Sequence, residues 1–592
     1  MVIVEFPNFS FLIFLLRERK SIDKLEVLFL FKNKSEVAQK IIEFVLETKN
    51  IKYSYSLMTA EKVFREQEVL CDFLVDDVFP DEFTRKSFVP DFIVFNLKNW
   101  FYCRLYRLSL IISFIKEEYP DHSEVLLYRH FFWFDRIDSR YLLRNFRFIG
   151  GFLDFANSPR DSEFQVEYRI SRLKEIKNSA IFSLGFIIIR GLRILFSQIR
   201  FGSGKPQVQN LVLTHENNCE RAWLSHKPFF EEFGDVNGFV TLDSHIILGE
   251  KKISIYKLLS WSFSEYFCTV IGAFQRAATC PRIPIELRLE HYSLMIEYGV
   301  WRAVLLSLKP KIFYSNVETN TATVIHSVAK DLGVTSVSST LSFGYFPTRY
   351  QRNHQTKFAE INFCWGELHK EILAESGSDP KSLVCGGYPG SLGFYDILHK
   401  SAGPFDSEQV VLYDSNLGPD MYLQKEQLSA VIAELRLFCD RFDWILCLKG
   451  KASNTFYGNE KDSDASNPPK LDMMRGSPYP IKNGALHIGF ASSTPALIAA
   501  SVGMPTILID PNHIIYPRLR RKLEPFVLNS LEDLTRTLDL VGKGHIDLER
   551  FCWSENLKAG INSAPTTGPF DLIRGLVNKT YSPDSLREIL LS

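Results

Sequence analysis

The chain has 592 residues, more than one hydrophobic core normally holds, so we expect two or three domains. Hydrophobic residues make up 46% of the sequence and charged residues 23%, which is typical of a globular protein rather than a disordered or fibrous one. Lys+Arg and Asp+Glu both number 69, giving a formal net charge of +0. The sequence therefore lacks the overall basic excess of most nucleic-acid-binding proteins, and any anionic ligand has to bind at a local site.

The ten cysteines are scattered, and no two of them form a C-x-x-C pair. Most lie in apolar runs, which is typical of buried free thiols in a reducing compartment and disfavours a disulfide framework or a zinc site. The first residues lack the basic start, apolar stretch and cleavage site of a signal peptide. Both features predict a cytoplasmic protein.

No segment reaches the roughly 18 uninterrupted apolar residues that a membrane-spanning helix needs. Residues 181–201 are long and apolar but include Arg190, Arg193 and Arg200. Two interpretations remain open for this segment. It is either a buried or half-buried helix, or a helix that lies on an anionic membrane surface with its arginines among the headgroups.

Strand-like and helix-like runs alternate along the chain, most clearly beyond residue 300, and this pattern predicts parallel α/β layers. The predicted strands lie at 27–31, 210–213, 311–314, 334–337, 361–364, 383–385, 410–413, 444–448, 486–488 and 506–509. The predicted helices lie at 321–332, 424–441 and 495–502. Ser, Gly, Pro and Asp cluster at 399–407, which predicts a boundary between a lobe of residues 1–400 and a lobe of residues 405–592.

The most informative segment runs from His487 through the Ser492-Ser493-Thr494-Pro495 turn. It reads as a strand, a turn of small residues and a helix with Thr494 at the N-cap and Pro495 in the first turn. Exposed amides and the positive end of the helix dipole form an anion site, to which the hydroxyls of residues 492–494 can add hydrogen bonds. The alternative is that these residues only cap a core helix.

The region before residue 400 contains a comparable unit, in which residues 315–320 connect a strand to a helix. Glu318 would lie at the carboxyl end of the strand, where open α/β sheets bind ligands. A carboxylate at that place could take a proton from an acceptor hydroxyl as a general base. The alternative is a first-turn glutamate that complements the dipole of its own helix.

Further polar residues follow neighbouring strands, and we expect them at the same kind of edge. They are Arg349, Arg352 and His354 after the strand at 334–337, Asp414 and Ser415 after the strand at 410–413, and Lys449 and Lys451 after the strand at 444–448. A lysine there can hold a phosphate as a point charge, or it can simply be solvated. His326 lies inside a predicted helix and is interpreted as a packed core residue. The acidic pairs at 76–77 and 81–82 lack a convincing context, so neither a metal nor a cofactor is expected.

The order of three segments resembles that of a known family. These segments are residues 359–367 with 384–390, the Ser-Ser-Thr-Pro helix with Gly503 and Pro505, and residues 526–534. Over residues 310–540 the succession is similar to GT-B glycosyltransferases of bacterial surface-polysaccharide synthesis, in particular capsule-type Kdo and sialic-acid transferases and related glycerophosphotransferases. The resemblance implies two Rossmann-like lobes with a cleft between them. It also implies an enlarged N-terminal lobe for the acceptor, a C-terminal lobe for the donor, and terminal helices after residue 547 that pack back on the first lobe.

The resemblance implies an enzyme that moves a sugar from a nucleotide-activated donor, of the CMP or UDP kind, to a saccharide or lipid-linked acceptor. In this interpretation Ser492, Ser493, Thr494, Lys449, Asp414 and Ser415 bind the donor, Glu318 is catalytic, and Arg349 and His354 line the acceptor side. The alternatives are a sugar-nucleotide epimerase, a polyol-phosphate transferase, or a non-catalytic protein on the same scaffold.

This sequence departs from the family pattern at two places. Many relatives carry a ribose-binding Glu in the helix after the serine pair, where this chain has Leu497-Ile498-Ala499-Ala500. Many also carry Lys-Pro-His-Pro where this chain has Lys449-Gly450-Lys451-Ala452. The resemblance therefore does not assign the nucleotide of the donor.

Overall fold

The fold is described from a computed structural model of the chain. The parts of the chain that it describes are residues 2–4, 26–29, 36–55, 124–128, 165–167, 210–213, 237–241, 245–248, 251–255, 258, 264, 266, 268, 271, 285–315, 320–339, 358–375, 378–387, 408–413, 425–449, 471–473, 485–490, 493–511, 515 and 517–562. Within these parts, no helix is long and apolar enough to cross a membrane. The arginine-containing segment 181–201 lies outside the described residues.

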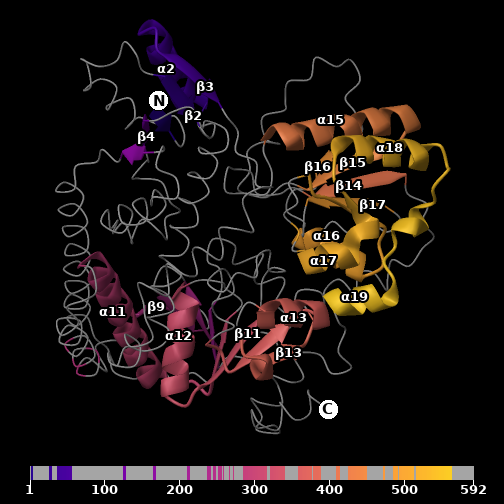
Figure 1. Ribbon diagram of the computed structural model, residues 1–592. Helices are drawn as coiled ribbons and strands as arrows, with labels where there is room; N and C mark the ends of the chain where they lie inside the picture. Colours follow the sequence, from indigo (N-terminus) through magenta and orange to yellow (C-terminus); the bar gives the residue numbers. More distant parts are fainter. Residues whose placement is uncertain are drawn as a thin grey trace. The chain divides into compact units, whose positions relative to one another are not determined.

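The described strands form three sheets, and parallel pairing dominates all of them (Figure 1). The chain divides into two compact units, one made of residues 1–196 and 269–296 and the other of residues 197–268 and 297–592. The α/β class with parallel sheets that the sequence predicts is thereby confirmed. The lobe boundary at 400–405 stays a prediction.

The first unit contains a five-stranded parallel sheet in the order β3-β2-β1-β4-β5. Its elements are β1 (Val2–Val4), β2 (Glu26–Phe29), α2 (Glu36–Thr48), β3 (Lys52–Tyr55), β4 (Glu124–Tyr128) and β5 (Gln165–Glu167). Helix α2 buries Ile42 and Leu46, and Tyr55 stacks on Phe29 between neighbouring strands. The sequence analysis predicted one strand of this sheet, at 27–31. The sheet itself was not predicted, because the sequence indicated two lobes and the described strands form three sheets.

The second unit begins with an eight-stranded sheet in the order β13-β12-β11-β10-β6-β7-β8-β9. Its strands are β6 (Asn210–Leu213), β7 (Asn237–Thr241), β8 (His245–Leu248), β9 (Lys251–Ser254), β10 (Ile312–Ser315), β11 (Thr335–Ser339), β12 (Ile361–Cys364) and β13 (Leu383–Cys385). The pairs β7–β8 and β8–β9 are antiparallel and the others are parallel. The strand order reverses between β6 and β10, which makes their carboxyl ends a topological switch point.

Three described helices and one short 3₁₀ helix accompany the eight-stranded sheet. They are α11 (Ile285–Leu308), α12 (Asn320–Asp331), α13 (Glu367–Glu375) and η7 (Pro380–Ser382). Helix α12 packs on β10 and β11. Gly333 ends α12 with φ +68°, a left-handed conformation that glycine adopts without steric cost.

The third sheet has six parallel strands in the order β16-β15-β14-β17-β18-β19. They are β14 (Gln409–Tyr413), β15 (Ile445–Lys449), β16 (Leu471–Met473), β17 (Leu486–Phe490), β18 (Thr506–Ile509) and β19 (Val527–Leu528). The accompanying helices are α15 (Lys425–Phe442), α16 (Thr494–Ser501), α17 (Pro517–Leu523), η10 (Glu524–Phe526), α18 (Leu531–Gly542), η11 (Leu548–Phe551) and α19 (Glu555–Ile561). The predicted strands and helices of this region all exist, with ends shifted by at most about two residues.

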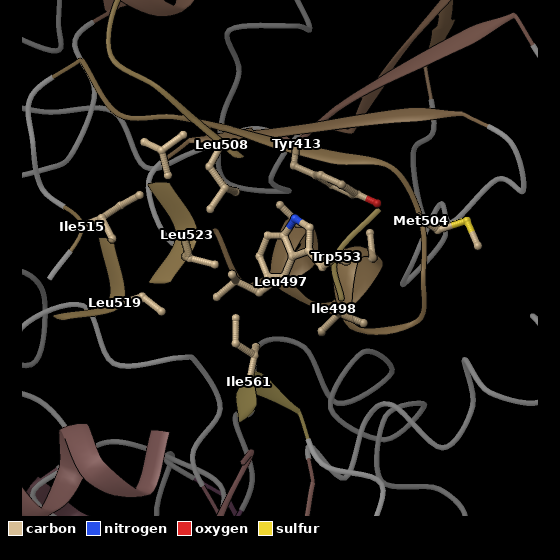
Figure 2. Close-up of a cluster of buried hydrophobic side chains, with 14 of the residues drawn as sticks. Tyr413, Leu497, Ile498, Met504, Leu508, Ile515, Leu519, Leu523, Trp553 and Ile561 are labelled. Carbon is tan, nitrogen blue, oxygen red and sulfur yellow. The ribbon is translucent and has the colours of Figure 1, made fainter. Parts of the chain in front are cut away.

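Helices cover both faces of the third sheet, so its strands are apolar on both sides. Val410 and Leu412 of β14 face the cluster formed with α15 and α18, whereas Val411 and Tyr413 face the cluster formed with α16 and α17. Figure 1 shows the strands between these two pairs of helices. In Figure 2, the indole of Trp553 lies within the second cluster, and its Nε1 donates to the Thr506 carbonyl at 3.3 Å.

Helix α19 packs against both α16 and α13. Trp365 and Leu368, at the start of α13, belong to the same buried cluster as Trp553 and Ile561. The backbones approach so closely that a Cβ atom on Gly366 would lie 2.5 Å from the carbonyl oxygen of Gly560. The close packing of α19 on α13 thus requires a glycine at position 366.

We expect Gly366→Ala to lower the free energy of unfolding by about 1–3 kcal/mol, because the added methyl group meets backbone atoms that do not rotate away. Gly560→Ala is the matched control. A Cβ there has its nearest neighbour at 4.0 Å, and replacing a helical glycine by alanine stabilises a helix by about 0.5–1 kcal/mol. Denaturant titration of both variants measures the difference, and equal stabilities of the two would contradict the close contact.

Candidate active site

The strand order of the third sheet reverses between β14 and β17, so the two strands on either side of the reversal are neighbours. In open α/β sheets, ligands bind outside the carboxyl ends of the strands at this switch point. The pairing matches Leu412 with Ile488, and Tyr413 with Lys449. The ends of β14, β15 and β17 therefore lie at one edge, which is the edge where the sequence placed its donor-binding candidates.

Helix α16 begins at this edge, directly after β17. Its N-cap is Ser493, whose N–H donates to the Phe490 carbonyl at 3.0 Å and whose carbonyl accepts from the Leu497 N–H at 2.9 Å. The prediction of Thr494 as the N-cap is wrong by one residue, because the first helical hydrogen bond is accepted by the Ser493 carbonyl. Pro495 occupies the first turn, as predicted.

The groups at the start of α16 that are available for a ligand differ from those that the sequence indicated. The Ser493 amide already bonds to Phe490, and Pro495 has no N–H, so the amides of Thr494 and Ala496 are the first ones of the helix without an intrahelical acceptor. The Ser493 side chain makes no capping hydrogen bond. Thr494 Oγ1 is buried and has no hydrogen-bond partner among the described residues.

A glycine in β17 allows this helix start to lie close to the sheet. A Cβ atom on Gly489 would lie 2.4 Å from Cβ of Ala496 and 3.1 Å from Cβ of Ser493. The body of the helix is buried, and Ala496, Leu497, Ile498, Ala499 and Ala500 are each 0% exposed. The helix thus contributes only its N-terminus to the edge. At the other end of the helix, Gly503 has φ +92°, the left-handed conformation that commonly ends a helix.

Most other candidate residues lie outside the described parts of the chain. These are Glu318, Arg349, His354, Asp414, Ser415 and Ser492, so their roles stay predictions. For Lys449 the structure describes the backbone, which ends β15 beside Tyr413. Among the described residues, no group of three or more His, Cys, Asp or Glu is arranged to hold a metal ion.

The sequence analysis did not single out a polar cluster at the same edge. Asp510, which directly follows β18, is 1% exposed and accepts from the Ile515 N–H at 3.0 Å. Its Oδ2 also accepts from Nη1 of Arg520 at 2.6 Å, and Nη2 of Arg520 donates to Oδ1 of Asn529, the residue after β19. The sequence position of Asp510 could have indicated it as a candidate, because Asp510 directly follows a buried strand, as several of the other candidates do.

The eight-stranded sheet has buried polar groups at its own carboxyl edge. Ser315, the last residue of β10, has its Oγ 2.8 Å from Nε2 of His326 on α12, and both residues are 0% exposed. Desolvation lowers the pKa of His326 to about 3, so the ring is neutral at ordinary pH. The interpretation of His326 as a packed core residue agrees with this environment.

Each described cysteine is a free thiol. Burial raises the pKa of Cys364 well above its ordinary value and the pKa of Cys385 to about 12. Thiols in such surroundings are poor nucleophiles and poor metal ligands, because both roles need the thiolate. Cys364 and Cys385 therefore fit the structural role that the apolar context of the cysteines predicted, whereas Cys268 is exposed.

Comparisons with known proteins identify structures of low similarity. No protein-family model matches the sequence. No curated protein matches it either. A UDP-GlcNAc 2-epimerase from Neisseria meningitidis bound to UDP-GlcNAc aligns with 63% of this chain and 100% of its own, at 10% identity and a TM-score of 0.39.

Two further structures are similar to the chain at this level. The UDP-GlcNAc 2-epimerase from Methanocaldococcus jannaschii, in complex with UDP-GlcNAc and UDP, covers 62% of this chain and 99% of its own, at 13% identity and a TM-score of 0.38. The wall teichoic acid polymerase TagF, from a CDPG soak, covers 71% and 100%, at 10% identity and a TM-score of 0.39. Similarity at this level does not specify a reaction for this chain.

The buried imidazole of His326 makes stability depend on pH. The folded state keeps the ring neutral down to about pH 3, whereas the unfolded chain protonates it near pH 6.5, so the folded state binds fewer protons between these values. Stability is therefore full above about pH 6.5 and falls as the pH is lowered toward 3. The slope from one such histidine is at most about 1.4 kcal/mol per pH unit.

We expect His326→Gln to reduce this dependence, because the amide can still reach Ser315 but does not titrate. Burial lowers the pKa of His369 to about 3 as well, so part of the dependence remains in the variant. Urea unfolding at pH 7.0, 6.0 and 5.0 gives the slopes, and the exposed His545→Gln is the control. Parallel curves for the wild type and His326→Gln would mean that His326 is not the titrating group.

Proposed function

We propose that this protein is a glycosyltransferase that takes a sugar from a nucleotide-activated donor and transfers it, without a metal ion, to a surface-glycan acceptor. One observation carries the proposal. The N-terminus of α16 lies at the switch point of the third sheet, and the buried Thr494 hydroxyl beside it has no partner in the described structure. This combination favours an anionic ligand, since a buried hydroxyl without a hydrogen bond costs about 1–3 kcal/mol.

The donor phosphate would bind to the Thr494 and Ala496 amides and to the hydroxyls of residues 492–494. The helix dipole adds about half a positive charge at this point. During transfer, negative charge develops on the leaving nucleotide, and prearranged donors in a partly dry site stabilise it without having to reorient. Lys449 ends β15, Asp414 and Ser415 come directly after β14 in the sequence, and all three would contact the rest of the donor.

The ribose of the donor would need a contact other than the body of α16. The relatives that the sequence resembles place a Glu in this helix, whereas residues 497–500 here are apolar and 0% exposed. A ligand does not reach these side chains without unpacking the core. Asp414 and Ser415 are the candidates for this contact, because they follow the neighbouring strand β14.

The acceptor would bind at the carboxyl edge of the eight-stranded sheet. Its strand order reverses between β6 and β10, and Glu318 comes three residues after the end of β10. Arg349 and His354 come after β11 in the sequence. In this proposal Glu318 takes the proton from the attacking hydroxyl, and the two basic residues line the acceptor side.

An epimerase or a polyol-phosphate transferase would use the same donor edge, so binding experiments do not separate them from a glycosyltransferase. The product does. Transfer to a saccharide or lipid-linked acceptor supports the proposal, whereas conversion of the donor without an acceptor favours an epimerase. A sample that binds nucleotide but neither transfers nor converts it would favour a non-catalytic role.

The double variant Ser492→Ala with Ser493→Ala tests the donor site. Each hydrogen bond to a charged oxygen is worth about 1.5–3 kcal/mol, so we expect donor affinity to fall by at least about tenfold. Titration calorimetry measures the affinity, and thermal melting checks the fold. The control is Ser554→Ala, which removes a serine that caps α19 through the Leu557 N–H. A double variant with unchanged affinity and a lowered melting temperature would reduce these serines to a structural role.

The variant Glu318→Gln tests the base. It keeps the size of the side chain but removes its ability to accept a proton, so we expect turnover to fall about a hundredfold or more with donor affinity unchanged. Initial rates at saturating donor measure the change. Near-normal turnover would return Glu318 to the role of a first-turn residue that complements its helix dipole.

A further inference from the structure

A second group of hydrogen-bond donors lies at the edge where the proposed donor site begins. Phe490 of β17 pairs with Ile509 of β18, and Ile509 pairs with Leu528 of β19. Asp510 and Asn529, the residues that directly follow β18 and β19, therefore lie next to each other in a row just beyond the sheet. The Asp510 N–H extends this row, since it donates to the Leu528 carbonyl at 2.9 Å.

Arg520 of α17 is fixed onto this row by two side chains. Its Nη1 donates to Asp510 at 2.6 Å and its Nη2 donates to Asn529. Asp510 is itself immobilised, because it is 1% exposed and also accepts from the Ile515 amide. Leu519, the neighbour of Arg520, is packed in the apolar cluster with Leu497 (Figure 2). The guanidinium is therefore held by two hydrogen-bond partners, and the packing of Leu519 fixes the helix that carries it.

This arrangement leaves part of the guanidinium available to a ligand. Arginine has five N–H donors, and the described contacts of Arg520 use two of them. The side chain is 22% exposed, so the group is not sealed in the core. The ion pair between Arg520 and Asp510 would be enough to hold α17 on the sheet. The second contact, with Asn529, also orients the planar guanidinium along the edge of the sheet. Oriented, partly exposed guanidinium groups bind the paired oxygens of phosphates well.

The position of Arg520 limits which ligand it can meet. Neighbouring strands are about 4.8 Å apart, so the end of β18 at Ile509, which Asp510 follows, lies about one strand spacing from Phe490, the last residue of β17. A phosphate at the start of α16 would then have its neighbouring group within reach of Arg520. The charge of Arg520 is partly compensated by Asp510, so the contact would act mainly through directed hydrogen bonds.

We propose that Arg520, positioned by Asp510 and Asn529, binds a second phosphate of the donor, and that the donor is therefore a nucleoside diphosphate sugar rather than a nucleoside monophosphate sugar. The inference rests on the proposed function, because it assumes that the first phosphate lies at the start of α16. It assigns a role to a cluster that the donor site described above does not use.

The test compares matched nucleotides, the mono- and diphosphates of cytidine, uridine and guanosine, by titration calorimetry. We expect the wild type to bind one diphosphate more tightly than its monophosphate. In Arg520→Gln, diphosphate affinity should fall by at least about tenfold, while monophosphate affinity stays within about twofold. Arg521→Gln is the control, since it removes the same charge from the next, exposed residue of α17 and should leave both affinities unchanged.

Arg520→Gln leaves the buried Asp510 carboxylate without its ion pair and can destabilise the fold, so Arg520→Lys is the second variant. Lysine keeps the charge beside Asp510 but does not form the fork, and it should lose the diphosphate preference with a melting temperature near that of the wild type. Equal losses for mono- and diphosphate, or an unchanged preference in both variants, would overturn the role of Arg520 and leave the proposed function standing. A wild type that binds none of the six nucleotides would refute the proposed function and this inference together.

Discussion

The parallel pairing of β14 with β17 is the constraint on which the candidate donor site depends. Because strand order reverses at this pair, α15 and α16, the helices that follow the two strands, lie on opposite faces of the sheet. In open α/β sheets, ligands bind outside the carboxyl ends of the strands at such a point. The register then decides which residues meet there. Tyr413 and Lys449 end neighbouring strands, and the turn after Phe490 leads into α16. A shift of one residue would turn every side chain to the other face.

Tight packing behind the edge holds α16 in place. Gly489 lets Ala496 and Ser493 approach the strand, and the helix body is buried among Trp553, Leu508 and Leu523. The same cluster includes Trp365 and Leu368 at the start of α13, so the start of α16 and the contact between α19 and α13 share one apolar core. A donor site with prearranged amides needs this rigidity, because its electrostatic benefit depends on groups that do not move when charge develops.

Buried polar groups occur in both of the larger sheets, and they differ in their hydrogen-bond partners. Ser315 Oγ lies 2.8 Å from Nε2 of His326, Nδ1 of the same ring has no hydrogen-bond partner among the described residues, and burial keeps the imidazole neutral. Tyr413 and His487 form a stacked pair, with the hydroxyl 2.9 Å from Nδ1. Thr494 also has a buried oxygen without a described partner, and Arg520 is partly exposed with donors that its described contacts do not use. What distinguishes Thr494 and Arg520 is their place at the carboxyl edge of the third sheet, where the donor is proposed to bind.

The sequence by itself determined the α/β class and the main elements of the third sheet, because buried parallel strands are short apolar runs and glycines such as Gly333 and Gly503 mark helix ends. It also located the start of α16 to within one residue, since Pro495 and the preceding hydroxyl residues are local signals. Only the tertiary structure decided that the Ser493 amide is occupied, that residues 497–500 are sealed in the core, and that Arg520 lies on Asp510 and Asn529. The reason is physical: strand order, register and burial arise from contacts between residues far apart in the chain, and a local pattern of residue types does not contain them.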